Sequence, residues 1–339
     1  MPSAQPTIAS DAATAGSRSK APVFVLGSVR SGTTLLYHML LSSGNFVVYR
    51  TESNVFNLLE PRFGDLSAKR NQRRLLKAWY DSRLYSLTGL DKQQLELRMG
   101  TECRNGGDFL RIVMEEMARK QGVERWADTT PDHLLYLDRI KQTIPSALII
   151  HVIRDGRDAA LSADKQHYVR TLPWDRTPSL LMAAMYWEWM VRKGRKGGRK
   201  LGNDYLEVRF EELIERPKET LARVGAFIEH ELDYDRIQQV GIGSVSKPNT
   251  SFGEKEDFNP VGRWKSRYSI KELAEVEALT GGTLQELGYE LATKDATSLR
   301  RPDLQRTKAL YKFYFDSKLY LKAKTSLGRL FVTRDLSWV

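Results

Sequence analysis

The chain alternates between short, mostly apolar runs and longer stretches with an apolar residue every three or four positions. The short runs are rich in β-branched residues and too short for buried helices, so they predict buried strands. They are VFVL at 23–26, FVVY at 46–49, ALIIHVI at 147–153 and YLEVRF at 205–210. The longer stretches predict helices at 33–43, 68–88, 107–121, 132–143, 180–194, 216–228 and 271–287.

This order of strands and helices predicts the fold class. Strands that are apolar on both faces need covering helices on both sides, which is typical of parallel sheets. We therefore expect an α/β fold in which a parallel β-sheet is flanked by helices on both faces. After about residue 243 the alternation of predicted strands and helices ends, and a long loop precedes the last helix.

Composition divides the chain into three parts. Residues 1–20 are small and polar and predict a disordered tail, 21–293 hold the α/β domain, and 294–339 form a basic, aromatic, helical extension. The extension has 11 lysines and arginines against four aspartates, so it carries +7 of the net charge of +11. It is interpreted first as an amphipathic helix packed on the domain. Docking to a membrane surface or a partner is the alternative, and nucleic-acid binding ranks third.

Charge and cysteine content narrow the classes of partner and compartment. The net charge of +11 over 339 residues indicates an anionic partner such as a nucleotide, a sulfated or phosphorylated ligand, a nucleic acid or a membrane surface. Cys103 is the only cysteine, which excludes an internal disulfide and fits a reducing compartment. The chain shows neither a membrane-spanning apolar run nor the apolar core of a signal peptide. We therefore expect a cytoplasmic protein, soluble or peripheral to a membrane.

A glycine-rich turn follows the first predicted strand. The segment 27–34, GSVRSGTT, has the glycine spacing of a Walker A phosphate loop, but Thr33 stands where that loop needs lysine. Backbone N–H groups and the helix dipole make such a turn an anion site, to which Arg30 adds a charge and Thr33 and Thr34 add hydroxyl donors. No convincing Walker B strand supplies a magnesium ligand, which disfavours a nucleoside triphosphatase.

A second segment, VIRDGRDAALS at 152–162, repeats this arrangement of strand, turn and helix. Arg154 stands at the strand end, and Ser162 lies two helical turns further on, so both side chains can reach one phosphate. The sequence therefore predicts two anionic groups at one edge of the sheet.

Together these two segments resemble the sulfotransferases that use 3'-phosphoadenylyl sulfate (PAPS). Two later stretches agree with the resemblance: YLEVRFEELIERPKETLARVGAFI, and VGRWKSRY at 261–268. It implies a P-loop-NTPase-like sulfotransferase fold, PAPS as co-substrate and no required metal. The cofactor-binding residues that it implies are Arg30, Ser31, Gly32, Thr33, Thr34, Arg154, Ser162, Tyr205, Arg263 and Trp264.

The resemblance also implies a catalytic pair. Some branches of the family use a glutamate after the second strand as general base, which here is Glu52, and Arg30 neutralises charge on the departing phosphate oxygen. Many relatives carry a lysine where this chain has Thr129. We expect Asp128 to orient the site, His133 to lie on a helix surface and His151 to be a satisfied core residue.

The expected acceptor is a small molecule, a carbohydrate or a lipid whose hydroxyl or amine takes the sulfuryl group, and no nucleic-acid partner is expected. Peripheral membrane contact through residues 294–339 stays open. Two other functions compete with this interpretation: a P-loop small-molecule kinase, and a non-catalytic protein that binds a nucleotide or an anionic membrane.

Overall fold

A sheet of four parallel strands lies at the centre of the computed structural model, which describes residues 18–169, 171–242, 259–293 and 302–332. The strand order is β2-β1-β3-β4, and every neighbouring pair is parallel. The strands are β1 (Val23–Leu26), β2 (Ala127–Asp128), β3 (Leu148–Ile153) and β4 (Tyr205–Arg209). The predicted α/β fold with a parallel sheet is confirmed.

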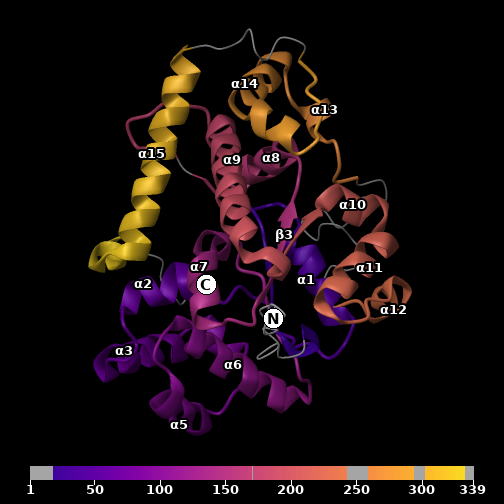
Figure 1. Ribbon diagram of the computed structural model, residues 1–339. Helices are drawn as coiled ribbons and strands as arrows, with labels where there is room; N and C mark the ends of the chain where they lie inside the picture. The colour runs from indigo at the N-terminus through magenta and orange to yellow at the C-terminus, as the bar shows by residue number, and fades with distance from the viewer. Residues whose placement is uncertain (1–17, 170, 243–258, 294–301, 333–339) are drawn as a thin grey trace, which may run out of the picture.

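Both faces of the sheet are buried, because successive side chains of each strand point to opposite sides. Val23 and Val25 pack into one apolar cluster, and Phe24 and Leu26 pack into the other. On the first face lie α1 (Thr33–Ser42), α11 (Pro217–Ile228) and α12 (Tyr234–Val240). On the second face lie α6 (Gly106–Gln121) and α9 (Ser179–Gly198) (Figure 1).

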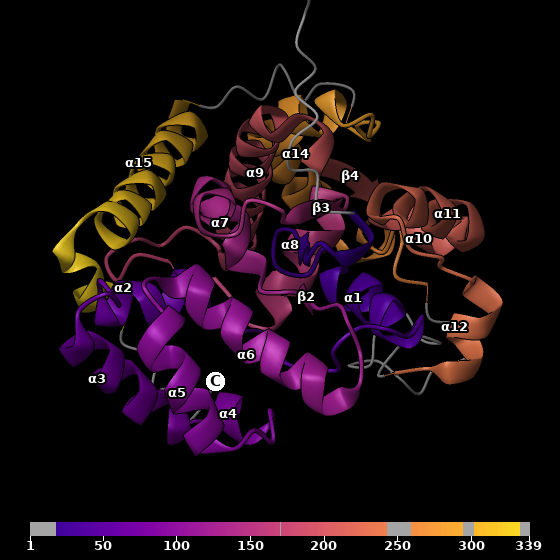
Figure 2. The ribbon, with the colours of Figure 1, turned by 60° about the horizontal axis from the view of Figure 1, so that its bottom comes forward.

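The other helices surround this core, with α3, α4 and α5 gathered beside α6 (Figure 2). The remaining α-helices are α2 (Glu60–Phe63), α3 (Lys69–Tyr80), α4 (Arg83–Ser86), α5 (Lys92–Glu102), α7 (Leu137–Thr143), α8 (Gly156–Lys165), α10 (Phe210–Glu215), α13 (Trp264–Arg267), α14 (Ile270–Glu286) and α15 (Pro302–Lys324). Five shorter elements complete the described chain: η1 (Arg18–Lys20), the π-helix η2 (Val55–Leu59), η3 (Pro131–Tyr136), η4 (Arg199–Asp204) and η6 (Ser326–Phe331).

The strand predicted at 46–49 is wrong. Only Phe46 forms an isolated bridge, with Arg125. Two residues further on, the side chain of Gln121 takes the place of a strand partner: its Oε1 accepts from the N–H of Val48, and its Nε2 donates to the carbonyl of Val48. The neighbour of β1 is instead the two-residue strand β2, which is too short to stand out in an apolar pattern.

Two predicted helices are interrupted. The stretch 68–88 contains α3 and α4, because the Ser82 hydroxyl accepts from the N–H of Tyr85 and starts a new helix. The stretch 132–143 begins as the 3-10 helix η3 and continues as α7.

The two ends of the chain pack on the domain where the structure describes them. Residues 1–17 of the expected disordered tail lie outside the described residues, and Arg18 of η1 donates hydrogen bonds to the carbonyls of Phe227 and Asn203. Within the C-terminal extension α15 lies along α9, where Asp316 accepts from the Trp189 indole (Figure 1). Among the described helices, none is both long and apolar enough to cross a membrane.

Candidate active site

The turn between β1 and α1 needs glycine at both of its glycine positions. Gly32 has φ +93°, and a Cβ there would lie 2.2 Å from the ring of Phe210. A Cβ on Gly27 would lie 2.5 Å from the carbonyl oxygen of Val152 on the neighbouring strand. The backbone of this loop is therefore packed closely between β3 and α10, and Thr33 and Thr34 open α1 at its N-terminal end.

Arg30 joins the two predicted anion segments. Its φ of +67° places it in the left-handed region, which is uncommon for an arginine. The Arg30 Nε donates to the Ser162 hydroxyl at 2.9 Å, and its carbonyl accepts from Arg154 Nη1 at 3.0 Å. Three of the predicted cofactor-binding residues thus meet at the carboxyl edge of the sheet.

Buried polar atoms remain unsatisfied at this edge. In the described part of the chain, the hydroxyls of Ser28 and Ser31 and the Nε of Arg154 have no hydrogen-bond partner. Arg154 also lies with its guanidinium carbon 4.6 Å from the centre of the Phe210 ring, and its Nη2 donates to the carbonyl of Pro260. Because buried polar groups are normally paired, these atoms are candidate contacts for a ligand.

The electrostatics of the edge favour an anion. Burial lowers the pKa of Arg154, and the charges of Arg263 and Arg30 lower it further, whereas Asp158 and Glu211 oppose that shift. Burial likewise lowers the pKa of Arg263, with a contribution from Arg30. Three guanidinium groups therefore lie within electrostatic range of one another, an arrangement that a bound anion would relieve.

Asp158 anchors the segment that carries Arg263 and Trp264. Its carboxylate accepts from the backbone N–H of Gly262 at 2.7 Å and of Trp264 at 3.0 Å. The Trp264 ring packs against Arg157, whose guanidinium carbon lies 3.8 Å from the ring centre. Sequence reasoning missed Asp158: its place in the first turn of α8 indicates a favourable interaction with the helix dipole, but no local pattern indicates the distant segment that it anchors.

The two arginines of RDGRD have different roles. Arg157 is paired with two carboxylates, Asp155 at 2.7 Å and Glu277 at 2.7 Å, so its charge is compensated within the protein. Among the described residues, Arg154 forms no such ion pair and donates to carbonyl oxygens only. Arg154 is therefore the arginine of this motif that has charge left for a ligand.

Tyr205 does not belong to this site. It is the first residue of β4 and pairs with Ile149 near the start of β3, whereas the candidate site lies where β3 ends at Ile153. Four residues of a strand separate these positions by about 13 Å. The Tyr205 hydroxyl contacts His151 Nδ1 at 2.6 Å and Glu207 instead. The prediction of Tyr205 as a cofactor-binding residue is wrong.

Glu52 lies beside the end of β2. The next residue, Ser53, contacts the Thr130 hydroxyl at 3.4 Å, and the N–H of Asn54 donates to the same hydroxyl at 3.2 Å. Thr130 follows β2 by two residues, so the segment with Glu52 reaches the carboxyl edge of the sheet, where the loop also lies. Thr129, at the position where the resemblance implied a lysine, is buried.

His133 is fully buried, so its predicted place on a helix surface is wrong. Its Nε2 accepts from the N–H of Phe56 at 3.1 Å, and its Nδ1 lies 2.8 Å from the carboxylate of Asp128. An accepting Nε2 leaves the proton on Nδ1, which donates to Asp128. This chain of hydrogen bonds fixes η2, the element after Glu52. His151 is a buried core residue as expected, but its Nε2 has no hydrogen-bond partner among the described residues.

Comparisons with known proteins agree with this architecture. The model of the sulfotransferase family matches residues 22–234, which is more than half of the chain. The sulfotransferase domain of the Synechococcus PCC 7002 olefin synthase aligns at a TM-score of 0.52 and 15% identity, covering 80% of this chain and 95% of that one. The sulfotransferase domain of the curacin biosynthetic pathway gives the same TM-score and identity, with 80% and 98% covered. The comparison with curated proteins gave no match. With its parallel sheet and its two linked anion segments, the chain belongs to the sulfotransferase family.

Proposed function

We propose that this protein transfers a sulfuryl group from PAPS to a hydroxyl or amine of an acceptor. The observation that carries the proposal is the pair of hydrogen bonds from Arg30 to Ser162 and from Arg154 to Arg30. They bring the two anion segments together, as a donor with two separated anionic groups requires.

The residues present fit such a donor. The Ser31 hydroxyl has no hydrogen-bond partner among the described residues, and the loop turns tightly at Gly32 into the N-terminal end of α1, an arrangement suited to a phosphosulfate. Arg154 and Ser162 supply charge and a hydroxyl for the 3'-phosphate, and Arg263 adds a second charge. When bound, PAPS supplies an activated sulfuryl group.

The chain's own residues then have three tasks. Glu52 takes the proton from the acceptor as the acceptor's oxygen or nitrogen forms its bond to sulfur and the bond from sulfur to the phosphate oxygen breaks, in line. Arg30 and the loop N–H groups stabilise the negative charge that grows on that phosphate oxygen. Thr129 offers no charge for this task, so Arg30 carries more of it than in relatives with a lysine.

Calorimetry with the product-like nucleotide tests the proposal without knowing the acceptor. Adenosine 3',5'-bisphosphate (PAP) should bind at least about tenfold more tightly than adenosine 5'-phosphate, because only PAP reaches Arg154. Equal affinities, or no binding of PAP, would contradict the proposal.

Nucleotide binding and turnover also distinguish the proposed sulfotransferase from the alternative of a small-molecule kinase. Thr33 replaces the lysine that clamps the phosphates of ATP, so binding of PAP should exceed that of ATP with magnesium. Release of PAP from PAPS that continues in EDTA would support sulfotransfer, and turnover of ATP that EDTA abolishes would support a kinase.

A further inference from the structure

Two neighbouring cavities lie beside α15, and we refer to the pair as the groove. The first, which we call the aromatic cavity, has a volume of about 460 Å³, and the second, which we call the basic cavity, has a volume of about 720 Å³. Leu135, Tyr136 and Lys322 line both cavities, so the two spaces adjoin at these side chains.

The aromatic cavity begins next to the candidate active site. Tyr168 is part of its wall, and the guanidinium carbon of Arg30 lies 6.0 Å from the centre of the Tyr168 ring. Further along, α9 contributes Tyr186 and Trp189, and α15 contributes Phe315. This wall is mostly aromatic and aliphatic, which suits an apolar body rather than a strongly hydrated one.

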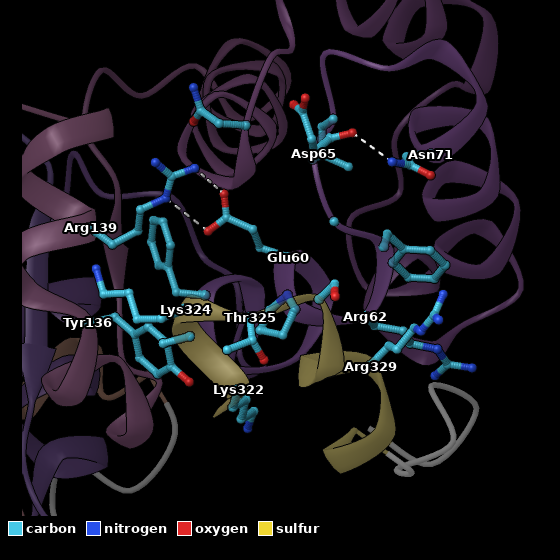
Figure 3. A pocket seen from close by; sticks show the side chains of 18 of the residues that line it. Glu60, Arg62, Asp65, Asn71, Tyr136, Arg139, Lys322, Lys324, Thr325 and Arg329 are labelled. Atoms are coloured by element: carbon cyan, nitrogen blue, oxygen red, sulfur yellow. Dashed lines mark hydrogen bonds and ion pairs between the residues drawn. The ribbon is translucent and has the colours of Figure 1, made fainter. Parts of the chain in front are cut away.

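The basic cavity has a different character (Figure 3). Its wall is built from α2, α3, α7 and the last turn of α15 with η6, and it holds seven basic against three acidic side chains. Among the acidic ones, Glu60 is already engaged by the guanidinium of Arg139 and by the N–H of Gly106. The basic side chains are Arg62, Arg74, Arg104, Arg139, Lys322, Lys324 and Arg329.

Much of this positive charge is not compensated within the protein. Among the described residues, Arg74, Arg104, Lys324 and Arg329 form no ion pair with a carboxylate. At the junction of the two cavities, burial lowers the pKa of the Lys322 ammonium group, and the charge of Lys318 lowers it further, while Asp132 opposes that shift. An anion placed here would be attracted by several cations at once.

The local sequence explains why the cations from the C-terminal extension converge. The Thr325 hydroxyl accepts from the N–H of Leu327 and donates to the carbonyl of Leu321, so it ends α15 and begins η6. A Cβ on Gly328 would lie 2.5 Å from the carbonyl oxygen of Lys322, so this position needs glycine. The chain therefore turns tightly back on α15 and brings Lys322 and Arg329 to one wall.

We propose that the acceptor is an anionic amphiphile that lies along this groove, with its carboxylate, sulfate or phosphate in the basic cavity and its apolar body in the aromatic cavity. Its free hydroxyl then faces the end where Tyr168 meets Arg30. The inference rests on the proposed sulfotransfer and assigns the C-terminal extension to acceptor binding.

A matched pair of probes tests it on the full chain. 12-Hydroxydodecanoic acid and its methyl ester carry the same chain and hydroxyl and differ in one charge. With PAP present at saturation, calorimetry should show the acid binding at least about tenfold more tightly than the ester. Equal binding of acid and ester would overturn the inference, and failure of PAP itself to bind would instead overturn the proposed function.

Variants of the basic cavity locate the effect. Lys322→Gln and Arg329→Gln should each lower the ratio of acid affinity to ester affinity about tenfold, while the affinity for PAP stays at the wild-type value. Arg329→Lys keeps the charge and should keep most of the preference. Arg306→Gln, at an exposed position of the same helix, is the matched control and should change neither affinity. A preference for the acid that survives both glutamine variants would show that the anion binds elsewhere.

Discussion

Glu52 has one proposed task, removal of a proton from the acceptor. Glu52→Gln keeps the size of the side chain and removes its basicity, so we expect turnover to fall by about 10²- to 10⁴-fold. The measurement is release of PAP from PAPS with an accepted hydroxyl compound. Binding of PAP, which depends on the loop and Arg154, should stay unchanged. Turnover at the wild-type rate would show that another group takes the proton.

Arg154 differs from its neighbour Arg157 in having no carboxylate partner among the described residues. Arg154→Ala should therefore weaken PAP binding by about 1.5–3 kcal/mol, the value of one charge-assisted contact. Adenosine 5'-phosphate, which has no 3'-phosphate, should bind the variant as it binds the wild type. Calorimetry measures both, and Arg216→Ala, at an exposed arginine, is the control. A loss of equal size for both nucleotides would contradict a contact with the 3'-phosphate.

Among single elements, η2 is held by the chain of hydrogen bonds through His133. His133→Leu would leave the N–H of Phe56 and the carboxylate of Asp128 without this partner in a buried place. We expect the free energy of unfolding to fall by about 3 kcal/mol, measured by urea denaturation. Gln285→Leu, at an exposed position of α14, serves as the comparison and should change the stability little. If both variants were equally stable, the buried hydrogen bonds would not be what fixes η2.

The elements also show where sequence patterns stop being informative. The apolar runs of β1 and β3 are buried on both faces, so their residues alone predict strands, and the glycine spacing after β1 predicts the loop. The segment 46–49 has the same apolar pattern, but its backbone is paired by a distant side chain, Gln121, which no local pattern shows. The structure of this segment therefore depends on a residue that is far away in the sequence.

Sequence patterns also predict some residues of the candidate site and miss others. Arg154 directly follows β3, Arg30 lies in the turn after β1, and Ser162 lies in the helix after β3. They could be predicted because the carboxyl ends of parallel strands lie at one edge of the sheet. Tyr205 was predicted from the family resemblance of its segment, although the first residue of a parallel strand lies at the amino edge of the sheet, away from the site. Asp158 and His133 act through backbone N–H groups of other segments, so only the three-dimensional structure reveals their roles.

At the scale of the whole molecule, the C-terminal extension is attached to the domain by several separate contacts. The Tyr311 hydroxyl accepts from the N–H of Leu172 at 3.3 Å, and Lys308 pairs with the buried carboxylate of Glu188 at 2.6 Å. The positive charge of α15 is therefore partly turned inward, toward α9 and the groove. Its outer face still carries exposed Phe313 and Tyr320, so peripheral membrane contact stays a prediction.

The stability of the whole molecule should depend on pH through His151. Burial, together with the charge of Arg195, lowers the pKa of His151 to about 3, whereas in the unfolded chain it is near 6.5. Below pH 6.5 the unfolded chain therefore binds a proton that the folded protein does not, and stability falls as the pH drops toward 3. This one residue adds a slope of about 1.4 kcal/mol per pH unit.

Urea denaturation at several pH values between 7 and 4 measures that slope for the wild type and for His151→Gln, which keeps a group able to bond the Tyr205 hydroxyl. The carboxylates and the other histidines titrate in both proteins, so their contributions cancel in the difference between the two slopes. We expect the variant to lose less stability than the wild type on acidification, by about 1.4 kcal/mol per pH unit below 6.5. Parallel curves would mean that His151 takes up its proton in the folded state, and hence that the core around β3 admits water or charge.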